Sequence, residues 1–223
     1  MSKIYYYTTI LNNIPIKEFI MSLNKQQKPK VVRILRIIEE YGLKFSSPYT
    51  KKLSGTNLWE IRILGRDNIR IIHAIIYNQD VLLLHGFFKK KQKTPKKDLE
   101  ISIDRHHDWI NRFGHWQWYH IWYHHICMSN KQKLYSLDDH FKELMNDHEF
   151  VAEWKKSEPE YLLAKQIIEK RIKKNISQRT LANRLRTSQA AISRIETMSG
   201  NPSLSFLKRI AEVFNTKLIL KFE

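Results

Sequence analysis

The sequence has a single cysteine, Cys127, among 223 residues. One thiol excludes an intramolecular disulfide and is typical of proteins from a reducing compartment. The chain also lacks any run that approaches the ~18–20 apolar residues of a membrane helix. Its first residues lack the apolar core of a signal peptide. These absences predict a cytoplasmic protein with no membrane partner.

Acidic side chains are scarce. The chain has 39 Lys and Arg against 22 Asp and Glu, a formal net charge of +17. Residues 1–104 carry 19 basic and 9 acidic side chains, net +10, and residues 128–223 carry 18 and 12, net +6. An excess of this size predicts polyanionic partners. More than half of it lies in the first 104 residues, where a solubilising surface is the alternative interpretation.

The first part of the chain has the pattern of an α+β domain. Residues 4–8 favour a short strand. Residues 15–25 and 30–41 favour helices, the second with apolar positions at helical spacing and Gly42 as its stop. Residues 58–64, 69–77 and 81–88 are β-rich runs with hairpin-length connections, and a last helix follows Pro95. We expect two helices, an antiparallel sheet and a C-terminal helix within residues 1–110.

The middle of the chain is unusual. Residues 106–127 crowd histidine, tryptophan and tyrosine together without a clear period, and His120 and His124 are the only i,i+4 histidine pair. Zinc-finger spacing is absent, so we expect no metal. Met128 resembles a fresh protein start. We therefore interpret residues 111–130 as a junction between two reading frames that became one.

The last part of the chain favours helices throughout. Residues 138–146 and 151–156 predict short helices, and Ser157 with Pro159 opens a long helix that reaches about residue 174. An all-α domain is expected over residues 131–223, with a short terminal strand added at residues 218–221.

Within it, residues 175–196 read NISQRTLANRLRTSQAAISRIE. Ser177 caps a short helix, and Thr187 with Ser188 caps a second helix whose outer face is polar. This stretch closely resembles the Xre/phage-repressor helix-turn-helix family, over about residues 161–223. The resemblance implies an operator-binding homodimer. The residues expected at DNA are Ser177, Gln178, Arg179, Ser188, Gln189, Ala190, Ser193 and Arg194. The resemblance implies that Gln178 and Arg179 contact the phosphate backbone, and that Gln189, Ala190, Ser193 and Arg194 lie in the groove.

The strings KKLSGTNLWEIR, from residue 51, and LLHGFFKKKQKTP, from residue 83, resemble the HigB branch of the RelE-type toxins. That resemblance covers residues 1–110. It implies a cofactor-free endoribonuclease that cuts mRNA, usually on the ribosome. Toxin before antitoxin is also the HigB–HigA order, and the second half resembles HigA.

The residues present fit such chemistry. Cleavage by the 2′-hydroxyl needs in-line orientation, stabilisation of the phosphorane and proton transfer. Arginine holds phosphate oxygens with a planar fork, and crowded lysines have a lowered pKa. The general base stays open between a lysine, His85 and Glu60. The expected catalytic residues are Arg62, Arg70, His85, Lys89, Lys90 and Lys93, and the expected RNA contacts are Lys51, Lys52 and Lys91.

The sequence therefore predicts a fused toxin–antitoxin protein, with toxin and antitoxin parts in contact in cis or in trans. His73 departs from the Tyr or Phe of many relatives. The alternatives are a plain transcription regulator with an inactive RelE-like domain, an artefact that joins two proteins, and a metal-dependent enzyme.

Overall fold

The computed structural model describes the chain except for residues 1, 44–48, 64–67, 90–93, 114–133 and 222–223. The chain folds into two compact units, residues 1–154 and residues 155–223. Among the helices that are described, none is both long enough and apolar enough to cross a membrane.

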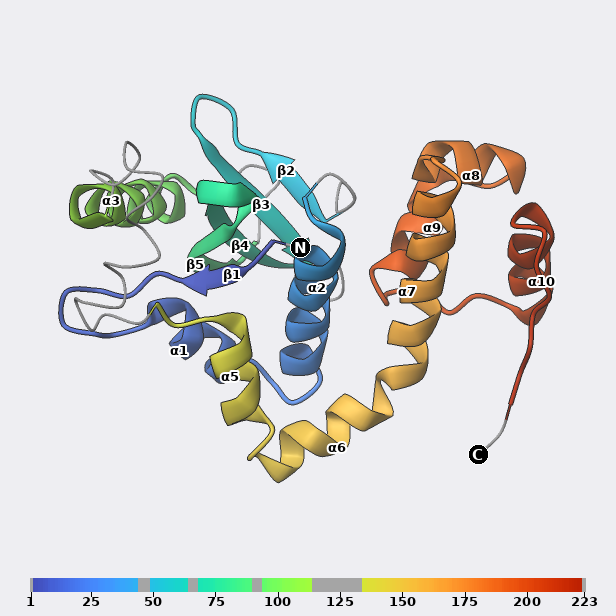
Figure 1. Cartoon of the computed structure of the whole chain (residues 1–223), viewed down its shortest axis with the longest axis horizontal. Helices are drawn as coiled ribbons and strands as arrows, with labels where there is room; N and C mark the ends of the chain where they lie inside the picture. The colour runs from blue at the N-terminus through green and yellow to red at the C-terminus, as the bar shows by residue number, and fades with distance from the viewer. Residues whose placement is uncertain (1, 44–48, 64–67, 90–93, 114–133, 222–223) are drawn as a thin grey trace. The chain divides into compact units, whose positions relative to one another are not determined.

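Five strands of the described chain form one mixed sheet in the N-terminal unit (Figure 1). They are β1 (Ile4–Tyr6), β2 (Thr50–Lys52), β3 (Leu58–Ile63), β4 (Ile69–Ile75) and β5 (Val81–Phe88), in the spatial order β1-β5-β4-β3-β2. Strands β2 to β5 pair antiparallel, as predicted for the three main runs. The prediction of a wholly antiparallel sheet is wrong at β1, which pairs parallel with β5. A parallel neighbour needs a long crossover, and the chain between β1 and β5 supplies one.

Helices cover both faces of this sheet. They are α1 (Pro15–Ser22), α2 (Gln27–Tyr41) and α3 (Lys96–Phe113), close to the predicted bounds. Helix α1 packs on Gly86 of β5, where an added Cβ would lie 2.1 Å from the Phe19 ring. Helix α3 packs on the other face, with Ile103 in one cluster with Leu58 of β3. Because alternate residues of a strand share a face, Glu60 and Arg62 of β3 also face α3.

Residues 134–154 belong to the N-terminal unit by their packing. This α5–α6 segment contains α5 (Leu137–Leu144) and most of α6 (His148–Lys156), close to the predicted helices. The sequence placed it in the antitoxin-like part, with the boundary at residues 111–130. The compact units instead divide after Trp154. Most of the predicted junction, residues 114–130, lies outside the described residues.

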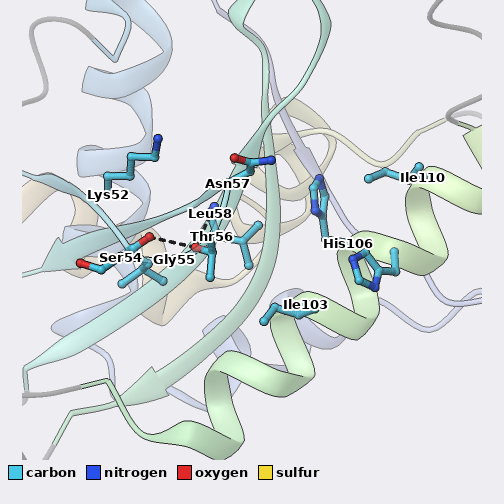
Figure 2. A pocket seen from close by; sticks show the side chains of 11 residues that line it. Lys52, Ser54, Gly55, Thr56, Asn57, Leu58, Ile103, His106 and Ile110 are labelled. Atoms are coloured by element: carbon cyan, nitrogen blue, oxygen red, sulfur yellow. Dashed lines mark hydrogen bonds between the residues drawn. The ribbon is translucent and has the colours of Figure 1, made fainter.

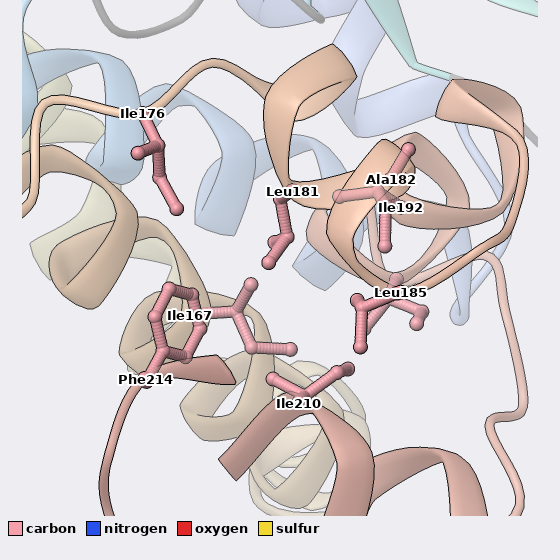
Figure 3. Close-up of a cluster of buried hydrophobic side chains, with 9 residues drawn as sticks. Ile167, Ile176, Leu181, Ala182, Leu185, Ile192, Ile210 and Phe214 are labelled. Atoms are coloured by element: carbon pink, nitrogen blue, oxygen red, sulfur yellow. The ribbon is translucent and has the colours of Figure 1, made fainter. Parts of the chain in front are cut away.

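The C-terminal unit is helical, as predicted. Its helices are α7 (Glu158–Lys173), α8 (Gln178–Arg184), α9 (Gln189–Glu196) and α10 (Leu204–Val213). Each gives at least one buried side chain to a common core, including Ile167, Leu181, Ile192 and Ile210 (Figure 3). The strand expected at residues 218–221 is wrong, because these residues have no regular secondary structure. A lone strand has no ladder partner in an all-helical unit.

Candidate functional site

Two arginines lie side by side on the α3 face of the sheet. Arg62 of β3 and Arg70 of β4 are direct cross-strand partners. Their side chains therefore leave the sheet on the same face, and Arg70 is only 7% exposed. The structure brings together two of the predicted catalytic residues.

A buried carboxylate lies at the centre of this group. Glu60 is 1% exposed, and its Oε1 lies 3.4 Å from Arg70 Nε. Lys89 Nζ donates to Glu60 Oε2 at 3.1 Å, and the Thr94 hydroxyl donates to the same oxygen at 2.8 Å. Arg70 and Lys89 therefore meet at one carboxylate on one side of the sheet. We call Arg62, Arg70 and Lys89, with Glu60, the basic cluster.

The basic cluster has more positive charge than Glu60 can neutralise. Burial lowers the pKa of Arg70, the Glu60 carboxylate opposes this shift, and the neighbouring Arg62 adds to it. The Nε atoms of Arg62 and Arg70 are buried, and neither has a hydrogen-bond acceptor among the residues the structure describes. Buried donors without an acceptor are costly, and an anion that reaches them gains charge-assisted hydrogen bonds.

His85 lies beside the basic cluster on β5, with both ring nitrogens engaged. Nε2 is 2.9 Å from Asp98 Oδ1, and Nδ1 is 3.2 Å from Arg105 Nη1. Burial lowers the pKa of His85, an effect opposed by the Asp98 hydrogen bond and strengthened by Arg105. Since arginine only donates, Nδ1 accepts and Nε2 carries the proton toward Asp98. This arrangement ties β5 to α3, and proton transfer by His85 stays a prediction.

The remaining predicted RNA contacts are lysines. Lys51 and Lys52 lie exposed on β2, at the edge of the sheet. Lys90, Lys91 and Lys93 lie outside the described residues, so the structure says nothing of their part.

The helix-turn-helix is built from capped helices in the C-terminal unit. The Ser177 side chain accepts from the Thr180 amide, and the Ser188 side chain accepts from the Ala191 amide. Both caps are those expected from the sequence. These caps fix where α8 and α9 begin. In α9, Ile192 and Ile195 are buried in the core, so its polar face points outward.

Most of the residues expected at DNA lie on the surface of α8 and α9, including their N-caps. The exposed ones among them are Ser177, Arg179, Ser188, Gln189, Ala190 and Arg194, and Ser193 is half-buried. Short polar side chains next to an arginine match what base edges and phosphates in a major groove accept. These residues stay predicted DNA contacts.

Gln178 differs from the others because its side chain is buried. It is 6% exposed, and its Nε2 donates to Glu196 Oε2 at 2.7 Å. Arg171 holds the same carboxylate from Nε and Nη2, at 2.8 and 3.1 Å. The Gln178 amide nitrogen therefore serves the interior of the unit. Sequence reasoning missed this network, because the three residues come from three helices.

Sequence reasoning also missed the contacts of the α5–α6 segment with the N-terminal unit. Tyr6 N donates to Tyr135 O at 2.9 Å, and the buried Tyr6 hydroxyl lies 3.0 Å from His140 Nδ1. Arg33, which is 1% exposed, donates to Trp154 O at 2.5 Å and stacks on its ring at 4.0 Å.

Charge complementarity extends the same interface. Arg36 pairs with Asp138 at 2.5 Å, and Lys17 pairs with Glu143 at 2.5 Å. The segment thus contacts α1, α2 and β1. These contacts leave the α3 face, which carries the basic cluster, on the other side of the sheet.

Comparison with known families agrees with this two-part organisation. Residues 18–107 match the family described as phage derived protein Gp49-like (DUF891). Residues 167–220 match a helix-turn-helix family. No curated protein matches the chain. The chain therefore carries a Gp49-like, toxin-type domain and an Xre-type helix-turn-helix domain that supports DNA binding, a combination that fits a toxin–antitoxin or regulator fusion.

Proposed function

We propose that the chain is a fused toxin–antitoxin protein. Its N-terminal domain is a HigB-like, RelE-type endoribonuclease that cuts mRNA on the ribosome, and its C-terminal part is a HigA-like repressor that binds its own operator as a dimer. The observation that supports the nuclease is the basic cluster, where Arg62 and Arg70 lie side by side with buried donors beside Lys89.

The basic cluster suits the transition state of RNA cleavage. The 2′-hydroxyl loses its proton and its oxygen attacks the adjacent phosphorus, while the 5′-oxygen leaves and takes up a proton. Negative charge builds on the non-bridging oxygens, where two guanidinium groups and one ammonium stabilise it. Glu60 holds Arg70 and Lys89 in place before the substrate arrives. In the described part of the chain, Glu60 is the carboxylate that contacts both Arg70 and Lys89, which keeps it among the candidate bases.

The contacts of the α5–α6 segment support a toxin–antitoxin interaction in cis. The segment follows the junction in sequence, yet it packs on α1, α2 and β1 of the toxin-type domain. Because these contacts lie away from the basic cluster, the segment does not act as a plug in the active site. We propose that it controls the domain from the opposite face.

A matched set of truncations tests the nuclease. Residues 1–113 lack the α5–α6 segment, and residues 1–156 retain it. We expect residues 1–113 to inhibit growth and to cut message on translating ribosomes. Arg70→Ala should lower cleavage by about 100-fold or more, as loss of one oxyanion donor does elsewhere. Lys96→Ala removes a charge that is 90% exposed, outside the cluster, and should cleave normally.

Circular dichroism measures whether each fragment is folded, and mapping of message ends measures whether it cuts. Intact message and normal growth with a folded 1–113 fragment would contradict a competent nuclease. Equal toxicity of the two truncations would instead contradict control by the α5–α6 segment.

A plain transcription regulator with an inactive toxin-type domain is the second candidate. The engaged ring of His85 favours it, because Asp98 and Arg105 occupy both nitrogens. DNA binding by the full chain, together with uncut message in every truncation, is the result that supports this reading.

A further inference from the structure

A pocket of about 670 Å³ opens on the α3 side of the N-terminal unit. One wall is the β2–β3 hairpin, residues 52–58, and the other is the C-terminal half of α3. Figure 2 shows Ile103, His106 and Ile110 on the helix turned toward the hairpin. Its volume lies within the range of small-ligand sites.

The pocket and the basic cluster share one face of the sheet. Strand β3 runs from Leu58, at the pocket, to Arg62 in the cluster, four residues that span roughly 13 Å. Helix α3 also reaches from the His85 side of the sheet to the pocket. Its Asp98 contacts His85, and its His106 lines the pocket. The interval between the pocket and the basic cluster equals about four stacked nucleotides, at 3.4 Å each.

The lining suits a nucleobase. Leu58, Ile103 and Ile110 offer apolar surface, and the His106 and His107 rings lie 6.5 Å apart at 27°. Histidine rings stack on bases in single-stranded RNA recognition. Burial lowers the pKa of His106, and the neighbouring His107 lowers it further, which favours the neutral ring, in which one nitrogen donates and the other accepts.

Polar groups at the rim complete the site. The hairpin presents Asn57 and Ser54, whose side chains can read a base edge, and Lys52, whose ammonium can meet a phosphate. The lining residues that the structure describes include no Asp or Glu to repel an anionic strand. The turn is held by the Leu53 amide, which donates to Leu58 O at 3.0 Å, and by the Thr56 hydroxyl, which donates to Leu53 O at 3.0 Å. The wall is thus formed before any ligand binds.

We propose that this pocket binds one base of the RNA strand whose phosphate lies at the basic cluster, and so sets a base preference about four nucleotides from the scissile bond. The proposal rests on the proposed nuclease function for the position of the strand.

The test uses the full chain and a short, fluorescent 2′-O-methyl oligoribonucleotide, which lacks the hydroxyl needed for cleavage. A single abasic site is moved along this strand, and binding is followed by fluorescence anisotropy. We expect one position at which removal of the base weakens binding about tenfold, the size of one stacking interaction.

Pocket variants give the decisive comparison. In His106→Ala and in Ile110→Glu, removal of the base at that position should weaken binding by less than about twofold. Ile110 is 40% exposed in the wild type. His148→Ala removes an exposed histidine of α6 and should keep the full tenfold effect. Equal binding of all abasic strands overturns the proposal, as does an effect that persists in both pocket variants.

Cleavage of message on translating ribosomes separates this proposal from the function on which it rests. Message cut by the wild type and spared by Arg70→Ala, without position-dependent binding, overturns the pocket alone. Position-dependent binding without any cleavage supports the pocket and overturns the nuclease.

Discussion

Arg171 and Glu196 form a buried ion pair that depends on its surroundings. Glu196 is fully buried and Arg171 is 6% exposed, and the guanidinium grips both carboxylate oxygens. Arg171 also donates to Ile176 O at 3.2 Å, and Gln178 satisfies the same carboxylate. Desolvation makes such a pair of modest net value, but removal of one partner leaves a buried charge without compensation.

Glu196→Ala should therefore destabilise the C-terminal unit strongly. We expect a loss of about 3–5 kcal/mol in the free energy of unfolding, measured by urea denaturation. Gln178→Ala should cost less, about 2 kcal/mol, since it removes one hydrogen bond to a charged group. The control is Glu212→Ala, an exposed glutamate on α10. A Glu196→Ala loss no larger than that of the control would contradict a structural role for the pair.

At the scale of elements, the α5–α6 segment combines exposed and buried contacts. The Lys25–Glu149 pair is exposed and the Lys17–Glu143 pair is partly exposed, and solvent-exposed pairs contribute little to stability. The contact of His140 with Tyr6 is different, because both residues are completely buried. We therefore attribute the attachment of the segment mainly to its buried side chains.

Burial makes this attachment sensitive to acid. It lowers the pKa of His140 to about 4, helped by the charge of Lys17 and opposed by Glu143, and burial lowers the pKa of His73 to about 4 as well. Above pH ~6.5 both rings are neutral in either state. As the pH falls toward 4, the unfolded chain binds the protons first. Each histidine then removes on the order of 2–3 kcal/mol from the stability of the N-terminal unit.

Urea unfolding between pH 7.5 and pH 4.5 measures this effect. His140→Asn keeps an acceptor near the Tyr6 hydroxyl but does not titrate, so it should remove about half of the loss on acidification. The exposed His148→Ala should leave the full loss in place. If wild type and His140→Asn differ by the same amount at every pH, His140 does not titrate as the structure implies.

At the scale of the whole molecule, the net charge predicts how binding to nucleic acid responds to salt. Both parts of the chain are basic, with net charges of +10 over residues 1–104 and +6 over residues 128–223. Binding to a polyanion releases counterions, so its affinity falls as salt rises. The exposed Arg179 and Arg194 are expected to make different contributions to this behaviour in the C-terminal unit.

Operator titrations at several salt concentrations separate the two arginines. Arg179→Ala should lower the slope of log K against log salt by about one, as loss of a phosphate contact does. Arg194→Ala should cost about 1–3 kcal/mol on the operator and relax its base preference. Lys155→Ala, on the exposed side of α6, should change neither quantity. An unchanged slope in Arg179→Ala would remove it from the phosphate contacts.

Local patterns in the sequence predicted most of the helices and strands and the two-part organisation of the chain. Helix caps such as Ser177 and Ser188 depend on residues within one turn of the helix, and the alternation along β3 depends on adjacent residues. A short stretch of sequence is therefore enough to predict them. The pairing of β3 with β4 also followed from a short connection. The structure adds the register, in which Arg62 lies opposite Arg70.

Only the tertiary structure decided which distant residues meet. The parallel pairing of β1, the burial of Gln178 at Glu196, the seat of His140 on Tyr6 and the pocket at His106 each join segments from different elements. The residues adjacent in sequence to each of these positions do not predict its distant partner. The free energy that selects them comes from burial and charge pairing, which exist only once the chain has packed.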